Sequence, residues 1–165
     1  MLLPKSCNCQ SRTDTVTLKL PHNHIFIMND KTEQELNTFI EEWKAAPDKN
    51  SSKSTFLRFK DYLAALENVT LDFIARPGVT YSLRATHNAQ KDRALFVMVD
   101  VIEDTERWLS VCFYGDMISD PEEKGDMVPG GLLGEDATCF DLEVQDETLI
   151  TYIETRIGEA SRNCR

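Results

Sequence analysis

Apolar residues recur with a helical period soon after residue 30. They fall at the spacing i, i+3, i+4 and i+7, on one face of a helix: Leu36, Phe39, Ile40 and Trp43. Thr32 followed by Glu35 is a capping-box pattern, which predicts that the helix begins near Thr32. Pro47 and the polar residues after it predict that the helix ends before residue 47.

Two more segments show the same period. A helix after Ser54 would bury one stripe of residues: Phe56, Phe59, Leu63 and Leu66. A helix over residues 146–159 would close the chain and bury a second stripe: Leu149, Ile150, Ile153 and Ile157.

Between these helices the period changes to two, which predicts strands. Residues 69–85 alternate on either side of Pro77-Gly78, a dipeptide suited to the centre of a type II turn, and therefore form a hairpin. Residues 95–102 are an almost continuous apolar run, residues 108–118 form another strand, and residues 138–142 a short one. Strands grouped together and flanked by helices predict an α+β fold. We expect an antiparallel sheet of four to five strands with helices packed on one face.

The first 28 residues do not match the pattern that follows. Met28 leads directly into the first helix, so we interpret residues 1–28 as an N-terminal extension, either a disordered arm or a stretch upstream of the true translation start at Met28. Residues 29–165 then form a single domain, a size that buries a proper core.

The net charge of −10 bears on partners and location. An acidic surface repels phosphate backbones and anionic lipid, so nucleic acid and membranes are disfavoured, and a protein or small molecule is favoured. No apolar run reaches the roughly 20 residues that span a bilayer. Five cysteines do not resemble a secreted disulfide framework, and Cys112 and Cys139 lie in apolar stretches as small core residues. These features predict a soluble, cytoplasmic protein.

Residues 119–137 form the most unusual segment, which we interpret as a long loop rich in glycine and acidic residues. Its apolar residues are expected to be buried and to hold it on the domain: Met127, Val128, Leu132 and Leu133. The leading hypothesis is a binding or interaction module that uses this loop, through Gly130, Gly131 and Gly134, together with Tyr114 and Asp116 at the adjoining strand end.

A second hypothesis is that the protein binds a cation, namely Ca²⁺, Mg²⁺ or Fe²⁺, which oxygen ligands hold. The candidate carboxylates in the loop are Asp120, Glu122, Glu123 and Asp126. The first helix offers others: Glu33, Glu35, Glu41 and Glu42. The spacing of these carboxylates matches no EF-hand loop. The glycine amides could instead bind an anion, but no lysine follows the glycines as a phosphate-binding loop requires.

Three further groups of residues could carry chemistry. Cys7, Cys9, His22 and His24 could together bind zinc, although one residue between the cysteines is an atypical spacing. His87 could act as a general base for Cys112 or Ser82, but no spacing joins them, so the sequence contains no recognisable catalytic constellation and does not identify a cofactor. Tyr81, Arg84, Trp108 and Tyr114 could line a shallow ligand surface. The alternative is that the rings are core and that Arg84 pairs with Asp72.

From Phe56 onward the layout resembles the small YdhG-like domains, whose fold is related to frataxin. The resemblance covers about 100 of the 165 residues. It rests on a helix, a strand over residues 95–101, a short strand over residues 138–142 and a closing helix. Two short motifs add to it: Gly78-Val79-Thr80-Tyr81-Ser82-Leu83 and Gly130-Gly131-Leu132-Leu133-Gly134. It implies a helix–sheet–helix sandwich and, for some members, iron handling, but no metal-binding residue matches by position. The helix near residues 32–43 and the long loop depart from the family pattern.

Overall fold

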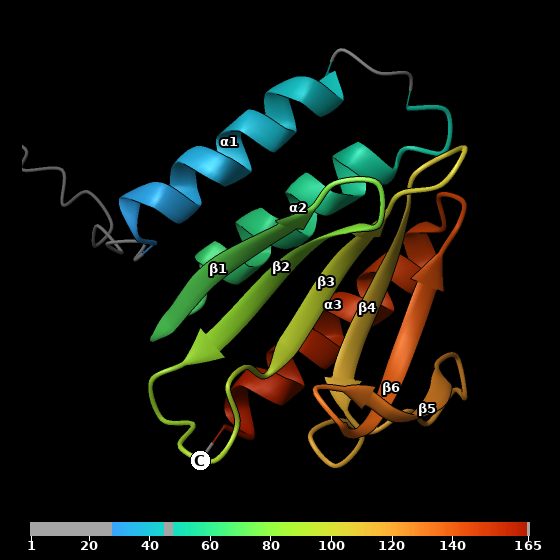
Figure 1. Cartoon of the computed structure of the whole chain (residues 1–165). Coiled ribbons are helices and arrows are strands. Elements are labelled where there is room, and N and C mark those ends of the chain that lie inside the picture. The colour runs from blue at the N-terminus through green and yellow to red at the C-terminus, as the bar shows by residue number, and fades with distance from the viewer. Residues whose placement is uncertain (1–27, 45–47, 165) are drawn as a thin grey trace, which may run out of the picture.

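The computed structural model describes residues 28–44 and 48–164, which form three helices and one sheet (Figure 1). The elements follow in the order α1 (Asp30–Lys44), α2 (Ser52–Ala64), β1 (Val69–Arg76), β2 (Thr80–His87), β3 (Val97–Ile102), β4 (Trp108–Tyr114), β5 (Asp126–Leu132), β6 (Glu135–Leu142) and α3 (Glu147–Arg162). The predicted α+β class is confirmed. None of the described helices combines the length and the apolar character needed to span a membrane.

The sheet is antiparallel throughout, with the strand order β1-β2-β3-β4-β6-β5. It has six strands rather than the four to five predicted, because β5 lies within the segment that we interpreted as a loop. Pro129 and two glycines in β5 weaken its strand pattern, but an edge strand tolerates a proline, and β5 is an edge strand.

Strand alternation divides the sheet into two faces. Most odd-numbered residues of β1 to β4, such as Leu83 and Val99, point toward the helices and are buried in the core, whereas Ala75 and His87 at the strand ends are not. In Figure 1, α2 and α3 lie behind the sheet and α1 lies along the β1 edge. The opposite sheet face, which we call the open face, is turned toward the viewer and carries Arg84, Met98 and Cys112 in one cross-strand row.

Helix α1 begins two residues earlier than the capping box predicts. The Asn29 side chain, rather than Thr32, caps the helix, since Asn29 Oδ1 accepts a 2.9 Å hydrogen bond from the Thr32 amide. Thr32 instead donates its hydroxyl to Asp72 on β1, at 3.1 Å. Phe39 then stacks on Tyr81 with ring centroids 4.1 Å apart, which fixes the helix on the sheet.

The predicted Pro77-Gly78 turn joins β1 to β2. The Val79 amide donates to the Arg76 carbonyl at 3.0 Å, and Gly78 has a φ of 77°, a value that glycine adopts without steric cost. The last helix, α3, begins after Asp146, whose side chain accepts hydrogen bonds from the amides of Thr148 and Leu149.

Candidate functional site

The segment between β4 and β5 is folded against α3 through Asp120. One oxygen of the Asp120 carboxylate accepts a 2.6 Å hydrogen bond from the Tyr152 hydroxyl, and the other accepts a 2.8 Å bond from the Gly125 amide. The Lys124 amide adds a third bond at 3.2 Å. Burial acts to raise the pKa of Asp120, but these hydrogen bonds outweigh it and hold the pKa below its ordinary value. The segment is therefore an ordered part of the domain.

A second set of contacts holds the beginning of this segment. The backbone amide and the hydroxyl of Ser119 both donate to Glu159 on α3, each at 3.0 Å. Arg156 donates to the Ser119 carbonyl at 2.6 Å. Both Lys124 and Arg156 lie over the Tyr152 ring, with the Lys124 nitrogen 4.8 Å from the ring centroid.

Strands β5 and β6 form a hairpin with an irregular register between Val128 and Leu132. Gly134, in the turn, has a φ of 93°, and a Cβ on Gly131 would lie only 2.6 Å from the Val128 side chain. Both positions therefore require glycine. The Gly130 amide donates to the Asp136 carboxylate at 3.0 Å, which closes the tip of the hairpin.

The apolar side chains of this hairpin are not all buried as predicted. Leu132 is fully buried, but Met127 is 78% exposed, Leu133 is 54% exposed and Val128 is also exposed. Met127 and Val128 lie on the edge strand β5, and Leu133 lies in the turn that follows it, so no further strand covers these side chains. Five large apolar residues are exposed in the described parts of the chain, and three of them belong to this hairpin.

Beside the hairpin, Arg93 binds two carboxylates at once. Its guanidinium lies 2.7 Å from Asp116 Oδ1 and 2.7 Å from Glu135 Oε2, and its Cζ is 4.2 Å from the centroid of the buried Tyr114 ring. The hydrogen bonds from Arg93 hold the pKa of Asp116 below its ordinary value. Arg93 thus joins the loop before β3 to the end of β4 and the start of β6.

A groove of about 580 Å³ runs between this cluster and the hairpin. Its walls include Asp116, Met127, Glu135, Asp136 and Arg93. A second depression of about 630 Å³ lies around the same arginine and is lined by Gln90, Asp92, Asn163 and Cys164 in addition. We call the exposed residues Met127, Val128 and Leu133 together with the groove beside them the hairpin surface.

The structure brings several of the predicted site residues to this surface. Asp116 and Gly134 line the groove, Tyr114 supports Arg93, and Gly130 and Gly131 shape the hairpin. Arg93 was missed, because nothing in its local sequence distinguishes it from other loop arginines.

Tyr81 and Arg84 lie elsewhere. Tyr81 is buried against Phe39 on the helix-covered face. Arg84 lies on the open face and donates to the Ser82 hydroxyl at 3.3 Å, while its cross-strand neighbour Asp72 accepts from Thr32.

Two of the four loop carboxylates of the metal hypothesis, Asp120 and Glu122, are engaged in other contacts. Asp120 is bonded to Tyr152, Glu122 lies 2.9 Å from Lys124, and Asp126 begins β5 opposite Cys139, while Glu123 adopts a positive φ. Within residues 28–44 and 48–164, no three His, Cys, Asp or Glu side chains are grouped so as to hold a metal ion. The zinc hypothesis on Cys7, Cys9, His22 and His24 falls outside the described residues.

The hydrolase hypothesis gains no support from the positions of its residues. His87 accepts a hydrogen bond from the Ala89 amide through Nδ1, at 3.1 Å. Ser82 is fully buried, and Cys112 is joined to Cys139 by a disulfide. Both cysteines are buried, as predicted. The sequence analysis did not predict the disulfide between them.

Comparison of the chain with protein-family models, with curated proteins and with solved structures found no match.

Proposed function

We propose that this domain is a protein-binding module that uses the hairpin surface. Its partner is a peptide segment in which lysine or arginine residues flank an apolar side chain. The single observation that carries the proposal is that three of the five exposed large apolar side chains of the described residues, Met127, Val128 and Leu133, belong to one hairpin, which the rest of the domain holds in place. Apolar side chains grouped on a surface and rimmed by polar ones mark interaction sites.

The charge of the surface defines the kind of partner. Residues 119–137 contain six carboxylates and one lysine, which gives a local formal charge of −5. Within the groove, Asp116, Glu135 and Asp136 outnumber Arg93, so the groove carries a formal charge of −2. Such a surface attracts cationic side chains and repels acidic ones, and this complementarity supports both the rate and the specificity of binding.

The rigidity of the surface also supports binding. Hydrogen bonds from Tyr152 and Gly125 to Asp120 order the segment before β5, and Arg93 ties the start of β6 to the end of β4. A binding surface that is already ordered loses less conformational entropy when a partner binds, so more of the contact energy contributes to affinity.

Selection from a random peptide library displayed on phage tests the proposal. We expect the selected peptides to be rich in lysine or arginine beside leucine, methionine or aromatic residues. The double variant Met127→Ser/Leu133→Ser should bind them at least roughly tenfold more weakly, since exposed anchors at the centre of an interface carry most of its energy.

The matched control is Val79→Ser/Val144→Ser, which removes two apolar side chains of comparable exposure, 57% and 69%, outside the hairpin. This control should bind the peptides with unchanged affinity. Selection of acidic peptides, or an equal loss of affinity in both double variants, would show that the hairpin surface is not the binding site.

A further inference from the structure

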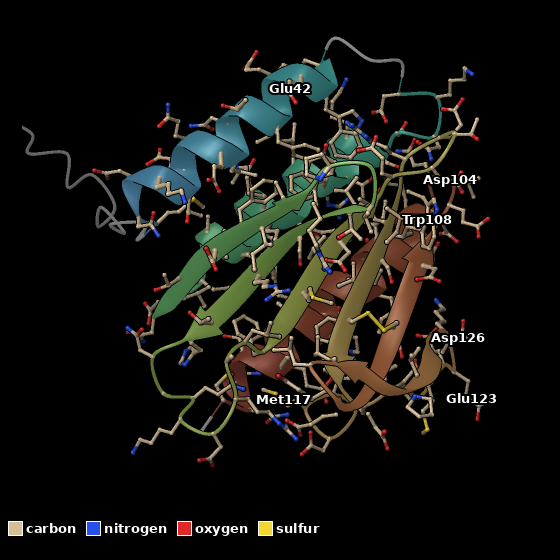
Figure 2. All side chains as sticks on the ribbon, in the orientation of Figure 1. Glu42, Asp104, Trp108, Met117, Glu123 and Asp126 are labelled. Atoms are coloured by element: carbon tan, nitrogen blue, oxygen red, sulfur yellow. A yellow bond between two sulfur atoms is a disulfide. The ribbon has the colours of Figure 1, made fainter. Side chains whose placement is uncertain are left out.

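Cys112 on β4 and Cys139 on β6 face each other directly on the open face of the sheet. They are register partners in the β4–β6 ladder, their Cα atoms are 4.1 Å apart, and their sulfurs are bonded. The disulfide is visible on the viewer's side of the sheet in Figure 2. None of the described helices packs over this face (Figure 1), although neighbouring side chains leave Cys112 only 6% and Cys139 only 8% exposed.

The bond does not create the contact between the two strands. Six pairs of residues, from Leu109 opposite Leu142 to Tyr114 opposite Ala137, already align β4 with β6. On the other face, Val111 and Phe140 are fully buried against the helices. Strand pairing and core packing therefore keep the two sulfurs adjacent after reduction, so the same fold accommodates both the disulfide and the two thiols.

The position of the bond relates it to the hairpin surface. The disulfide closes a ring of chain from Cys112 to Cys139, and this ring contains Asp116, Met127 and Glu135. Asp126, the first residue of β5, is the register partner of Cys139 itself. A covalent link at this point restricts the motion of the hairpin relative to β4.

We propose that Cys112 and Cys139 form a reversible redox site whose substrates are low-molecular-weight thiols and disulfides of the glutathione type. In the cytoplasm, the location that the sequence predicts, disulfides are mostly transient and regulatory. We further propose that the oxidised form holds the hairpin surface in its binding conformation. This second statement rests on the proposed function, whereas the redox chemistry does not.

Reduction of the Cys112–Cys139 disulfide consumes two molecules of a thiol reductant. A thiolate of one reductant molecule attacks one sulfur of the pair and forms a mixed disulfide, while the other cysteine leaves as a thiolate and takes up a proton. The thiolate of a second reductant molecule then attacks the sulfur of the bound reductant, which releases the second cysteine thiolate, and this thiolate is protonated. Two electrons and two protons enter the protein, and two thiols leave as one disulfide.

Thiol trapping in the wild-type chain tests the redox site directly. The folded protein is equilibrated in buffers with different ratios of reduced to oxidised glutathione, quenched with acid, alkylated and digested with trypsin. Cleavage after Arg107, Lys124 and Arg156 places Cys112 and Cys139 in separate peptides, so each thiol is counted by mass. We expect both to change state together in native buffer, with a melting temperature roughly 10 °C lower in the reduced form.

Hydrogen exchange and peptide affinity test the coupling to the hairpin. In the reduced form, and in the variant Cys112→Ser/Cys139→Ser under all conditions, amides of β5 and β6 should exchange faster while those of α3 do not change. Affinity for the selected basic peptides should fall severalfold on reduction in the wild type and should not respond to glutathione in the variant.

A pair that stays oxidised in millimolar reduced glutathione until the protein unfolds, or that never oxidises, would overturn the redox site. Reduction with unchanged exchange in β5 and β6 would overturn the coupling. If trapping and exchange behave as expected but no peptide binds either form, the proposed function fails and the redox site stands.

Discussion

The hydroxyl of Tyr152 donates a 2.6 Å hydrogen bond to the carboxylate of Asp120, across 32 positions of the sequence. Through this bond α3 holds the segment that leads into β5. The Tyr152 ring also packs edge-on against Phe140 in β6, with centroids 5.9 Å apart. One side chain thus contacts both ends of the chain segment that forms the candidate site.

Replacing Tyr152 by phenylalanine tests the importance of this bond. Tyr152→Phe keeps the ring and its packing but leaves an oxygen of the Asp120 carboxylate without its shortest hydrogen bond. We expect the free energy of unfolding to fall by about 1–2 kcal/mol, measured by urea denaturation. Thr151→Ala, at an exposed position one residue earlier, should have little effect. A variant as stable as the wild type would show that the bond does not order the segment.

Acid should destabilise the protein partly through Asp116 and Asp120. The pKa of each is held below its ordinary value in the folded state, Asp116 by Arg93 and Asp120 by hydrogen bonds that outweigh its burial. A carboxyl with a lowered pKa stabilises the fold fully above its unfolded pKa of about 3.9, and this contribution is lost as pH falls through the folded value.

We therefore expect the free energy of unfolding to decrease from about pH 5 downward, and Asp120→Asn to decrease less steeply. Asp61→Asn, whose side chain is exposed on α2, serves as the control and should follow the wild-type curve. The measurement is urea denaturation at a series of pH values. An Asp120→Asn curve parallel to that of the wild type would contradict the assignment.

Arg93 is expected to be sensitive even to a conservative change. Lysine at position 93 keeps the charge but cannot bind Asp116 and Glu135 with two nitrogens at once, nor lie flat over the Tyr114 ring. Arg93→Lys should therefore lower the free energy of unfolding by about 1 kcal/mol and weaken binding of the selected peptides. Lys91→Arg, at an exposed position in the same loop, is the control. Unchanged stability and affinity in Arg93→Lys would exclude an organising role for the guanidinium.

Asp100 on the open face is expected to behave in the opposite way to Asp120. Burial raises its pKa, although a hydrogen bond from Ser82 and the nearby Arg76 and Arg84 partly oppose this effect. Its Oδ1 is buried and has no hydrogen-bond partner in the described structure. A carboxyl with a raised folded pKa costs stability when it is ionised, and this cost disappears as pH falls below the unfolded value.

Asp100→Asn should consequently raise the melting temperature at pH 7, and the advantage over the wild type should shrink as pH falls toward 4. Thermal denaturation at both pH values measures it, and Asp104→Asn, in the exposed β3–β4 turn, should give no gain. A melting temperature at pH 7 that is lower for Asp100→Asn than for the wild type would contradict this interpretation.

The parts of the fold that depend on local patterns could be predicted from the sequence. The apolar stripes of α1 and α3 follow directly from residues such as Phe39 and Ile153, and the Pro77-Gly78 turn from the conformational preferences of its two central residues. Strand β5 could not be recognised, because Pro129 and its glycines resemble a loop and only the position at the sheet edge makes them compatible with a strand.

The contacts of the candidate site depend on distant residues, so only part of it could be predicted. Composition drew attention to residues 119–137 and to Asp116. Arg93 and Tyr152 reach the site only through the packing of β3 and α3. Likewise, the bond between Cys112 and Cys139 depends on β6, rather than β5, being the neighbour of β4, a strand order that the spacing of 27 residues does not reveal.

Chemical-shift mapping tests the binding surface most directly. A selected basic, apolar peptide is titrated into the ¹⁵N-labelled full-length protein, and every backbone amide is followed. We expect shifts concentrated at residues 115–117 and 126–137 and at Arg93, with α1 unaffected although its exposed side carries Glu33, Glu41 and Glu42. Shifts confined to α1, or spread evenly over acidic residues, would show that the hairpin surface is not where this protein binds.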